Sequence, residues 1–296
     1  MNKPVSIMVA GRSTVDLIME IDEFSRRAEK FKASDSCFVV GGPGANASIA
    51  IARFGGLPAL ITFLGDDMMG KFIHQSLINE SVDLSMSVIS SEAQSSVSAA
   101  FVDRKGERQT FNFPGKGFSE LPTALNPSFR PSAVLADNRH SELTKWAIEI
   151  GRRQNLPIVI DAEAPFAVED IIGATHLAFS RQGLESFFPG CNIRTALQQA
   201  QIETGCWVCV TDGENGVWFL QDNLLDNIPA FKIKTVDTVG AGDVWHGVFT
   251  LCLAEEMGEM AAIKTANAAA AMKCQNFGGI AASPDRQACL TFIEEY

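Results

Sequence analysis

The sequence alternates short, nearly apolar runs with longer amphipathic stretches, and this rhythm constrains the fold more than any other feature. Each run is four to six residues long and is rich in Val, Ile, Leu and Ala. Such runs are typical of parallel strands that helices cover on both faces. We expect strands at residues 5–10, 59–63, 133–136, 157–160, 176–179 and 207–210.

Helical patterns occupy most of the segments between these runs. Gly55 and Gly56 follow the first of them and are a typical helix stop. The alternation predicts an α/β fold, with a doubly wound, mostly parallel sheet flanked by helices, in one domain over residues 1–296. We expect helices at residues 46–54, 71–79, 141–154, 193–203, 242–257 and 260–274.

Two segments break the rhythm. Residues 12–40 end in the alternating pattern SDSCFVV, and residues 93–113 alternate polar and apolar side chains around the turn signal Asp103-Arg104-Lys105-Gly106. Alternation of this kind indicates strands with one exposed face. We expect the two segments to form a small antiparallel β-sheet, which would act as a lid over a site or as a contact between subunits.

The charge balance limits the partners of the chain. It has 24 Lys and Arg against 35 Asp and Glu, a formal net charge of −11. Proteins that bind nucleic acid through its phosphates are usually basic. We therefore expect no nucleic acid and no membrane as partner, and an anionic substrate would need a local cationic pocket.

The cysteines and the amino-terminal segment bear on the cellular compartment. The chain has seven cysteines, an odd number that fits reduced thiols. Residues 1–11 have no small-residue cleavage site, and no apolar run reaches about 18 residues, the length of a membrane span. We expect a cytoplasmic protein. Cys206 and Cys209 lie within an apolar run, which favours a buried strand over a redox or zinc site.

The most specific motif is Asp237-Thr238-Val239-Gly240-Ala241-Gly242-Asp243, which precedes a long apolar helix. Small residues let backbone N–H groups point at one spot, where the helix dipole adds positive potential. Gly240, Ala241 and Gly242 would therefore form an anion hole. Asp243 at its edge would accept a proton, so the motif suits transfer of a phosphoryl group to a hydroxyl. The alternative is an ordinary loop with an Asp helix cap.

A second glycine motif, Gly41-Gly42-Pro43-Gly44-Ala45-Asn46, also leads into a helix and suits recognition of a polyol. A third segment, residues 65–71, has the spacing of a P-loop. Phe72 stands where a P-loop has Ser or Thr, so we reject that interpretation.

The two glycine motifs, in this order and at this distance, resemble the ribokinase (PfkB) family of carbohydrate kinases, and the likeness covers the whole chain. It includes VAGRSTVD, GDDMMG, VTDGENG and TANAAAAMKC. The resemblance implies a ribokinase-like fold, a β lid that mediates a homodimer, a small-molecule sugar as substrate, and ATP with Mg2+ as cofactors. It also implies the site residues: Asp243 as catalytic base, Asp16, Gly42 and Asn46 on sugar hydroxyls, and Thr211, Gly213, Gly216 and Asn267 at the nucleotide.

Several segments are similar to the sulfofructose kinases of that family, including VLADNRH and FVDRKGERQTFNFP. In that group a Lys, an Asn and an Arg hold the sulfonate, and the matching positions are Lys30, Asn112 and Arg139. Two cations and an amide in one pocket would suit an anionic substrate. The Asn-x-x-Glu that organises magnesium in many members is replaced at residues 180–183, so no metal ligand is assigned.

These features favour an ATP-dependent kinase for a primary hydroxyl of an anionic ketose, with 6-deoxy-6-sulfofructose as substrate. Two alternatives stay open. One is a kinase of the same family for a ketohexose, a sugar phosphate or a sugar acid. The other is a sugar-binding protein without catalysis, because a fold does not fix a function.

Overall fold

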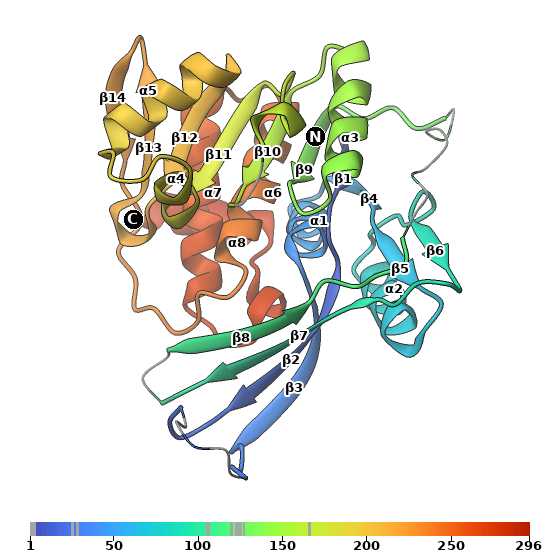
Figure 1. Cartoon of the computed structure of the whole chain (residues 1–296). Coiled ribbons are helices and arrows are strands. Elements are labelled where there is room, and N and C mark those ends of the chain that lie inside the picture. The colour runs from blue at the N-terminus through green and yellow to red at the C-terminus, as the bar shows by residue number, and fades with distance from the viewer. Residues whose placement is uncertain are drawn as a thin grey trace.

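The computed structural model describes residues 4–24, 27, 30–104, 107–118, 121, 126, 128–164 and 167–296. Its largest element is an eight-stranded sheet with the order β14-β13-β12-β11-β10-β9-β1-β4 (Figure 1). The strands from β4 to β12 in this order run parallel, and β13 is antiparallel to both of its neighbours, β12 and β14. Their bounds are β1 Ser6–Ala10, β4 Leu57–Ile61, β9 Ala133–Asp137, β10 Ile158–Ala162, β11 His176–Ser180, β12 Trp207–Thr211, β13 Val217–Gln221 and β14 Leu224–Ile228.

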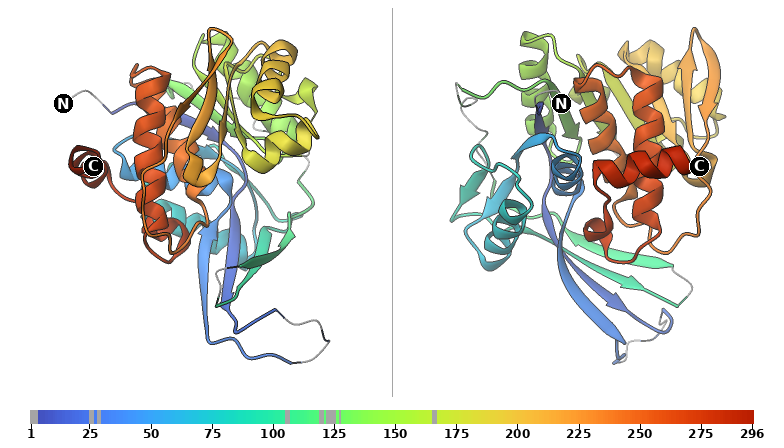
Figure 2. Two further views of the ribbon diagram at one scale, coloured as in Figure 1. Left: turned by 90° about the vertical axis from the view of Figure 1, so that its left-hand side faces the viewer. Right: turned by 180° about the vertical axis from the view of Figure 1, so that it is seen from behind.

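Helices cover both faces of this sheet, as Figure 2 shows. One face packs on α1 (Pro43–Arg53), α6 (Ala241–Ala254) and α7 (Glu259–Cys274), and the other on α3 (Ser141–Arg153), α4 (Arg181–Phe187) and α5 (Ile193–Thr204). Helix α8 (Arg286–Glu295) packs on α7. This arrangement confirms the doubly wound α/β fold that the apolar rhythm predicts.

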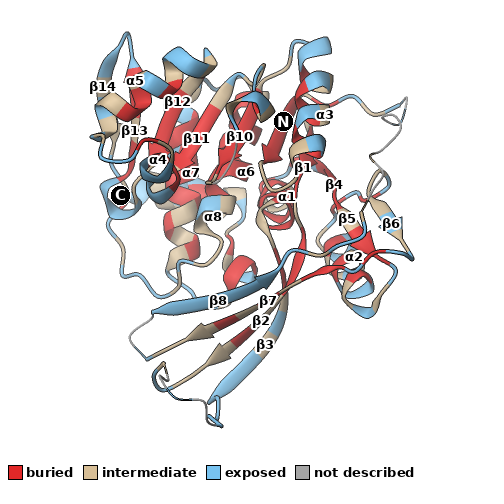
Figure 3. Cartoon of the chain, in the orientation of Figure 1, coloured by how far each residue is buried: buried red, intermediate tan, exposed pale blue. Residues whose placement is uncertain are grey.

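Two apolar clusters form the core, one on each side of the sheet. Successive residues of a strand point to opposite faces, so Ile7 and Val9 of β1 belong to the cluster under α1 and α6, and Met8 belongs to the cluster under α3. The interior residues of the parallel strands are thus buried on both faces of the sheet, which explains why these strands have no polar alternation (Figure 3). Among the described residues, no helix is long and apolar enough to cross a bilayer.

A separate four-stranded sheet, here called the small sheet, extends from one end of the molecule (Figure 1). Its order is β3-β2-β7-β8, with β2 at Thr14–Glu20, β3 at Asp35–Gly41, β7 at Ser96–Val102 and β8 at Arg108–Phe113. These strands come from the two segments in which the sequence pattern alternates. The pairing of β2 with β7 is parallel, whereas the sequence favoured a wholly antiparallel sheet, because β2 and β7 belong to different segments and are not joined by a turn.

Some elements were not expected from the sequence. The run at residues 59–63 divides between β4 and a short strand β5 (Phe63–Gly65), which pairs with β6 (Val88–Ser90). Helix α2 (Met68–Asn79) begins earlier than expected because Asp67 Oδ1 accepts a hydrogen bond from the Gly70 N–H at 2.7 Å. The hairpin of β13 and β14 turns at Asp222 and Asn223, which both have positive φ.

Candidate active site

The loop before α6 contains one residue, Gly240, with a backbone conformation that favours glycine. Gly240 has φ 75°, in the left-handed region, and directly precedes the first helical residue. The Val244 N–H donates to the Gly240 carbonyl at 3.0 Å, and the Ala241 N–H donates to the Thr238 carbonyl at 3.2 Å. The Ala241 N–H is therefore engaged within the loop in this structure, although Gly240, Ala241 and Gly242 lie together at the helix N-terminus.

The second glycine motif begins α1 beside this loop. Gly42 has φ 90°, and a Cβ there would lie 2.6 Å from the Arg12 carbonyl oxygen, so a larger residue would clash. Asn46 is buried in the first turn of α1, and its Nδ2 donates to Asp243 Oδ2 at 2.7 Å. The two motifs, almost 200 residues apart, thus meet through one hydrogen bond.

Two cavities lie on either side of the loop before α6. The smaller cavity, about 470 Å³, is lined by Asp243 and by residues of the small sheet. The larger cavity, about 570 Å³, is lined by Ala241 and by residues of α7 and the β12–β13 turn. Thr238 and Gly242 line both cavities. A group held at the N-terminus of α6 is therefore accessible from both sides.

The smaller cavity contains most of the residues that the sequence assigned to a sugar. Asp16, Gly42, Asn46, Asn112 and Arg139 all line it. Asp16, Ser98 and Asn112 are paired in register across β2, β7 and β8, so their side chains project from one face of the small sheet. Lys30 is exposed and does not line this cavity. The structure therefore gathers two of the three expected anion-binding residues.

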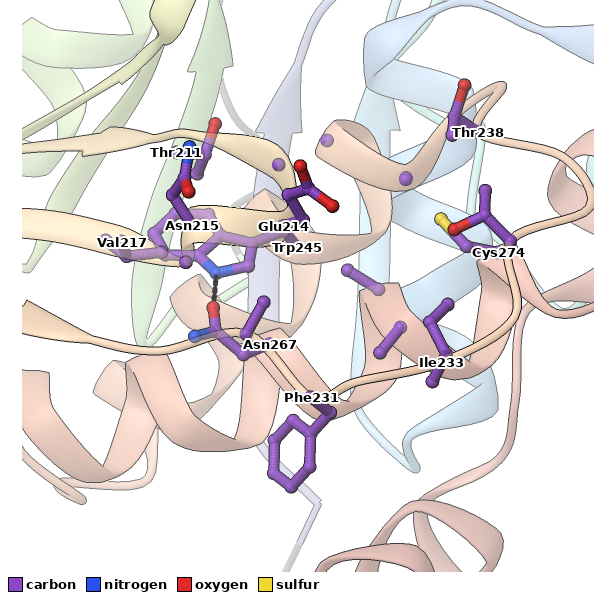
Figure 4. Close-up of a pocket in the computed structure, with 18 of the residues that line it drawn as sticks. Thr211, Glu214, Asn215, Val217, Phe231, Ile233, Thr238, Trp245, Asn267 and Cys274 are labelled. Carbon is purple, nitrogen blue, oxygen red and sulfur yellow. Dashed lines mark hydrogen bonds between the residues drawn. The ribbon is translucent and has the colours of Figure 1, made fainter.

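The larger cavity contains the residues that the sequence assigned to a nucleotide, and Figure 4 shows two of them, Thr211 and Asn267. Thr211, Gly213, Gly216 and Asn267 line it. Trp245 Nε1 donates to Asn267 Oδ1 at 2.8 Å, and Asn267 Nδ2 donates to the carbonyls of Ile228 and Pro229. These bonds fix the Asn267 amide and the Trp245 ring at one side of the cavity.

The carboxylates near the smaller cavity have perturbed acidities. Burial raises the pKa of Asp243 to about 6, and the nearby charge of Asp161 adds to this rise, while the hydrogen bond from Asn46 opposes it. Burial also raises the pKa of Asp16 to about 6. A carboxylate with a pKa near 6 is ionised at neutral pH but holds a proton more strongly than an ordinary Asp. Asp243 thus has the acidity that suits a general base.

Behind Asp243 lies a buried polar group that the sequence did not indicate. Asp161 Oδ1 is 3.6 Å from His246 Nδ1, and the His246 Nε2 is 3.3 Å from the Ala178 carbonyl. Burial raises the pKa of Asp161 to about 7 and lowers the pKa of His246, which favours the neutral imidazole. Asp161 lies at the carboxyl end of β10, and such ends of parallel strands meet at one edge of a sheet, a signal that could have identified it.

Other residues at this edge of the central sheet were also missed. Arg12 lies two residues after β1 and Glu163 directly after β10, and both line the smaller cavity. Asp137 is the last residue of β9. A single carboxylate at the end of an apolar run was the sequence feature that could have identified it. Glu163 is positioned by Ser180, whose hydroxyl donates to it, and lies 3.7 Å from Arg139 Nη2.

The base of the loop before α6 is held by a buried ion pair. Lys273 has no exposed surface, and its Nζ donates to the Asp237 carbonyl at 2.8 Å and lies 3.2 Å from Asp237 Oδ2. Asp237 also accepts hydrogen bonds from the N–H groups of Val239 and Gly279. The first residue of the motif is thus anchored to the end of α7.

No set of three or more His, Cys, Asp or Glu in the described part of the chain could hold a metal ion by itself. Mg²⁺ is often bound by one or two carboxylates together with substrate phosphates. The residues present are therefore compatible with a Mg²⁺ ion that is bound mainly through the phosphates of a nucleotide. They do not single out a protein ligand for it.

Comparison with known proteins places this geometry in one family. The model of the pfkB family carbohydrate kinases matches residues 5–286. The chain is 28% identical to the ribokinase of Bacillus subtilis over 95% of this chain and 97% of that protein. It is 25% identical to the fructokinase of Vibrio alginolyticus, with 97% and 98% covered.

A solved structure agrees with this result. The ribokinase of Thermotoga maritima superposes with a TM-score of 0.83 at 25% identity, over 98% of this chain and 99% of that one. The family match extends over both glycine motifs and both cavities. The chain belongs to the pfkB family of carbohydrate kinases, and it is a phosphotransferase that uses ATP and an alcohol acceptor.

Proposed function

We propose that this kinase transfers the γ-phosphoryl group of ATP to the primary hydroxyl of an anionic ketose, with 6-deoxy-6-sulfofructose phosphorylated at O1. The observation that carries this proposal is the gathering of Arg139 and Asn112 into the cavity that Asp243 lines. Arg108, on β8, lines the same cavity. Arginine donors at one site of a protein with a net charge of −11 favour an anionic group on the substrate.

In this proposal the smaller cavity holds the sugar and the larger cavity holds ATP. Asp243 accepts the proton of the attacking hydroxyl, and Asn46 orients its carboxylate through the 2.7 Å hydrogen bond. Backbone N–H groups at the start of α6 stabilise the charge on the phosphoryl group as it passes between the cavities. Mg²⁺ accompanies ATP and neutralises phosphate charge. The small sheet excludes water by closing over the sugar.

The direct test is an ATP-consumption assay with magnesium on sulfofructose, fructose, fructose 6-phosphate and ribose in parallel. We expect the highest kcat/KM with sulfofructose. A higher value with another sugar would remove the sulfofructose assignment and leave the kinase chemistry in place. Sugar binding without ATP turnover on any substrate would instead favour a non-catalytic binder.

The role of Arg139 has a separate test. Arg139→Ala should lower kcat/KM for sulfofructose by about 30-fold or more, since truncating one partner of a half-buried charge contact costs about 2 kcal/mol or more. Activity on fructose should change little. An equal loss on both sugars would mean that Arg139 supports the structure of the cavity and does not bind the anion.

The relatives favour a second candidate. They are a ribokinase and a fructokinase, whose names denote neutral sugars. Lys30, the third expected anion-binding residue, does not line the cavity. A kinase for a neutral ketohexose or pentose would use the same Asp243 and would leave Arg139 with a structural role through Glu163.

We also propose a homodimer that forms through the small sheet. Phe38, Leu17, Ala99 and Phe111 lie in one row across β3, β2, β7 and β8, on the face opposite Asp16. Phe38 and Phe111 are 58% and 60% exposed, so this face offers a second copy an apolar surface. A cytoplasmic location is proposed as well, since ATP is the donor and all seven cysteines are free.

A further inference from the structure

We propose that Arg12 is a second anion-binding residue of the sugar cavity, beside Arg139, and that Asp137 positions both arginines. The inference rests on the proposed function, because it concerns the anionic group of that substrate. Arg12 and Arg139 are 127 residues apart in the sequence and come from the turns after β1 and β9, which are neighbours in the central sheet.

One buried carboxylate connects the two turns. Asp137 is 4% exposed, its Oδ2 accepts the Arg12 N–H at 2.7 Å, and its Oδ1 accepts the Arg139 N–H at 3.0 Å. Both donors are backbone N–H groups, so these bonds fix the backbone of the two turns independently of the arginine side chains. Because both hydrogen bonds go to one carboxylate, they fix the two turns relative to each other, which two bonds to separate acceptors would not do.

Both residues then reach the smaller cavity. Arg12 Nη2 donates to the Arg139 carbonyl at 3.5 Å, which brings the Arg12 guanidinium to the Arg139 turn. Arg12 and Arg139 both line the smaller cavity. The structure therefore brings two arginines from neighbouring turns to the same cavity.

The charges at this point favour a bound anion. Burial lowers the pKa of Arg12, the charge of Asp137 opposes this, and the smaller effect of the Arg139 charge adds to it, so Arg12 is attracted to Asp137 as well as repelled by Arg139. The Asp137 oxygens accept backbone N–H groups, and Glu163 is 3.7 Å from Arg139 Nη2, longer than a good charge-assisted hydrogen bond. An anion between the two guanidinium groups would add an attraction to each of them, beyond the compensation that Asp137 provides.

The chemical class of the ligand follows from the donors. Guanidinium groups bind oxyanions through paired N–H donors, and two of them suit a tetrahedral anion with three terminal oxygens. A sulfonate and a phosphate monoester at C6 of a ketohexose share this chemistry. A carboxylate has only two oxygens and would engage the pair less completely.

The test compares Arg12→Gln, Arg139→Gln and the double variant. Each is assayed for kcat/KM with sulfofructose, fructose 6-phosphate and fructose. Arg104→Gln is the matched control, because Arg104 pairs with Asp22 on the surface and lines neither cavity. Thermal unfolding of each variant establishes that it is folded.

We expect Arg12→Gln to lower kcat/KM for the preferred anionic sugar by about 30-fold or more, with fructose changed less than about threefold. The double variant should lose less than the product of the two single losses, because both arginines contact one group. If Arg12→Gln behaves like Arg104→Gln while Arg139→Gln loses the anionic sugar, the inference is wrong and the proposed function stands.

Two further outcomes separate the hypotheses. The wild type could prefer fructose 6-phosphate to sulfofructose, while Arg12→Gln lowers kcat/KM for fructose 6-phosphate and leaves that for fructose nearly unchanged. This result would support the two-arginine site and reject sulfofructose as the substrate. Preference of the wild type for fructose itself would overturn both.

Asp137→Asn tests the positioning role. An amide keeps one acceptor oxygen and places an NH₂ group against the other backbone donor, so one of the two turns is released. We expect the ratio of kcat/KM for the anionic sugar to that for fructose to fall at least tenfold. A variant that is less stable but keeps the wild-type ratio would show that Asp137 is only structural.

Discussion

At the scale of single residues, Asp243 combines a position at the first turn of α6 with a carboxylate oriented by Asn46. Asp243→Asn keeps the shape and the contact with Asn46 but cannot accept the substrate proton. We expect kcat to fall by about 100- to 10,000-fold, with the Kd for the sugar nearly unchanged. The measurement is single-turnover phosphoryl transfer together with calorimetric sugar binding. Near-normal turnover would remove Asp243 from the role of base.

The pH dependence of activity follows from the same residue. Since burial raises the pKa of Asp243 to about 6, the ionised base is lost as the pH falls through 6. We expect kcat/KM to decrease about tenfold per pH unit below this value. Asp16 also has a pKa of about 6, so its protonation would add to the decrease. A pH profile of Asp16→Asn separates the two contributions, and a flat profile between pH 5 and 7 would contradict both.

The ionisation of Asp243 affects stability in the opposite direction to activity. A carboxyl group with a raised pKa in the folded state stabilises that state when protonated, below the unfolded pKa of 3.8, and this contribution is lost as the pH rises through about 6. The ionised Asp243 carboxylate at neutral pH therefore destabilises the folded state relative to the protonated form. This is a common compromise at active sites, where function requires a group that the fold alone would not favour.

At the scale of elements, the contact between α7 and the loop before α6 depends on Lys273. Its ammonium is fully buried against Asp237, whose side chain is 8% exposed. Lys273→Met would leave Asp237 with a buried negative charge, and we expect a loss of about 3–5 kcal/mol in the free energy of unfolding. Urea denaturation measures this loss.

Lys264→Met is the matched control, because Lys264 lies on the same helix and is exposed. It should change the free energy of unfolding by less than about 0.5 kcal/mol. Adding Asp237→Asn to Lys273→Met should restore part of the loss by removing the buried charge. An effect of Lys273→Met no greater than that of the control would show that the ion pair does not hold the loop.

At the scale of the whole molecule, the small sheet has two different faces. One face lines the smaller cavity and the other carries exposed Phe38, Phe111 and Phe113. We expect the wild type to sediment as a dimer and Phe38→Ser/Phe111→Ser to sediment as a monomer. Ile202→Ser, on α5, is the control, since Ile202 is 82% exposed and lies outside the small sheet. A monomeric wild type would reject the dimer.

The sequence predicts the layered fold well because local pattern and global environment agree. The strands at residues 133–137 and 176–180 are buried on both faces, so their apolar runs are visible without any structure. The hairpin of β13 and β14 was not predicted because β14 is largely exposed and polar, so it has no apolar run, and its turn lies at Asp222 and Asn223 rather than at a glycine.

The sequence by itself determined the α/β class, the two glycine motifs and Asp243, because each depends on residues that are neighbours in the chain. Only the tertiary structure decided that Asp137 connects Arg12 to Arg139 and that Asp161 lies beside His246. It also decided that Lys30 is outside the cavity that Asn112 and Arg139 line. The physical reason is that parallel strands bring their carboxyl ends to one edge of the sheet, so residues far apart in sequence meet there, and no local pattern encodes which of them touch.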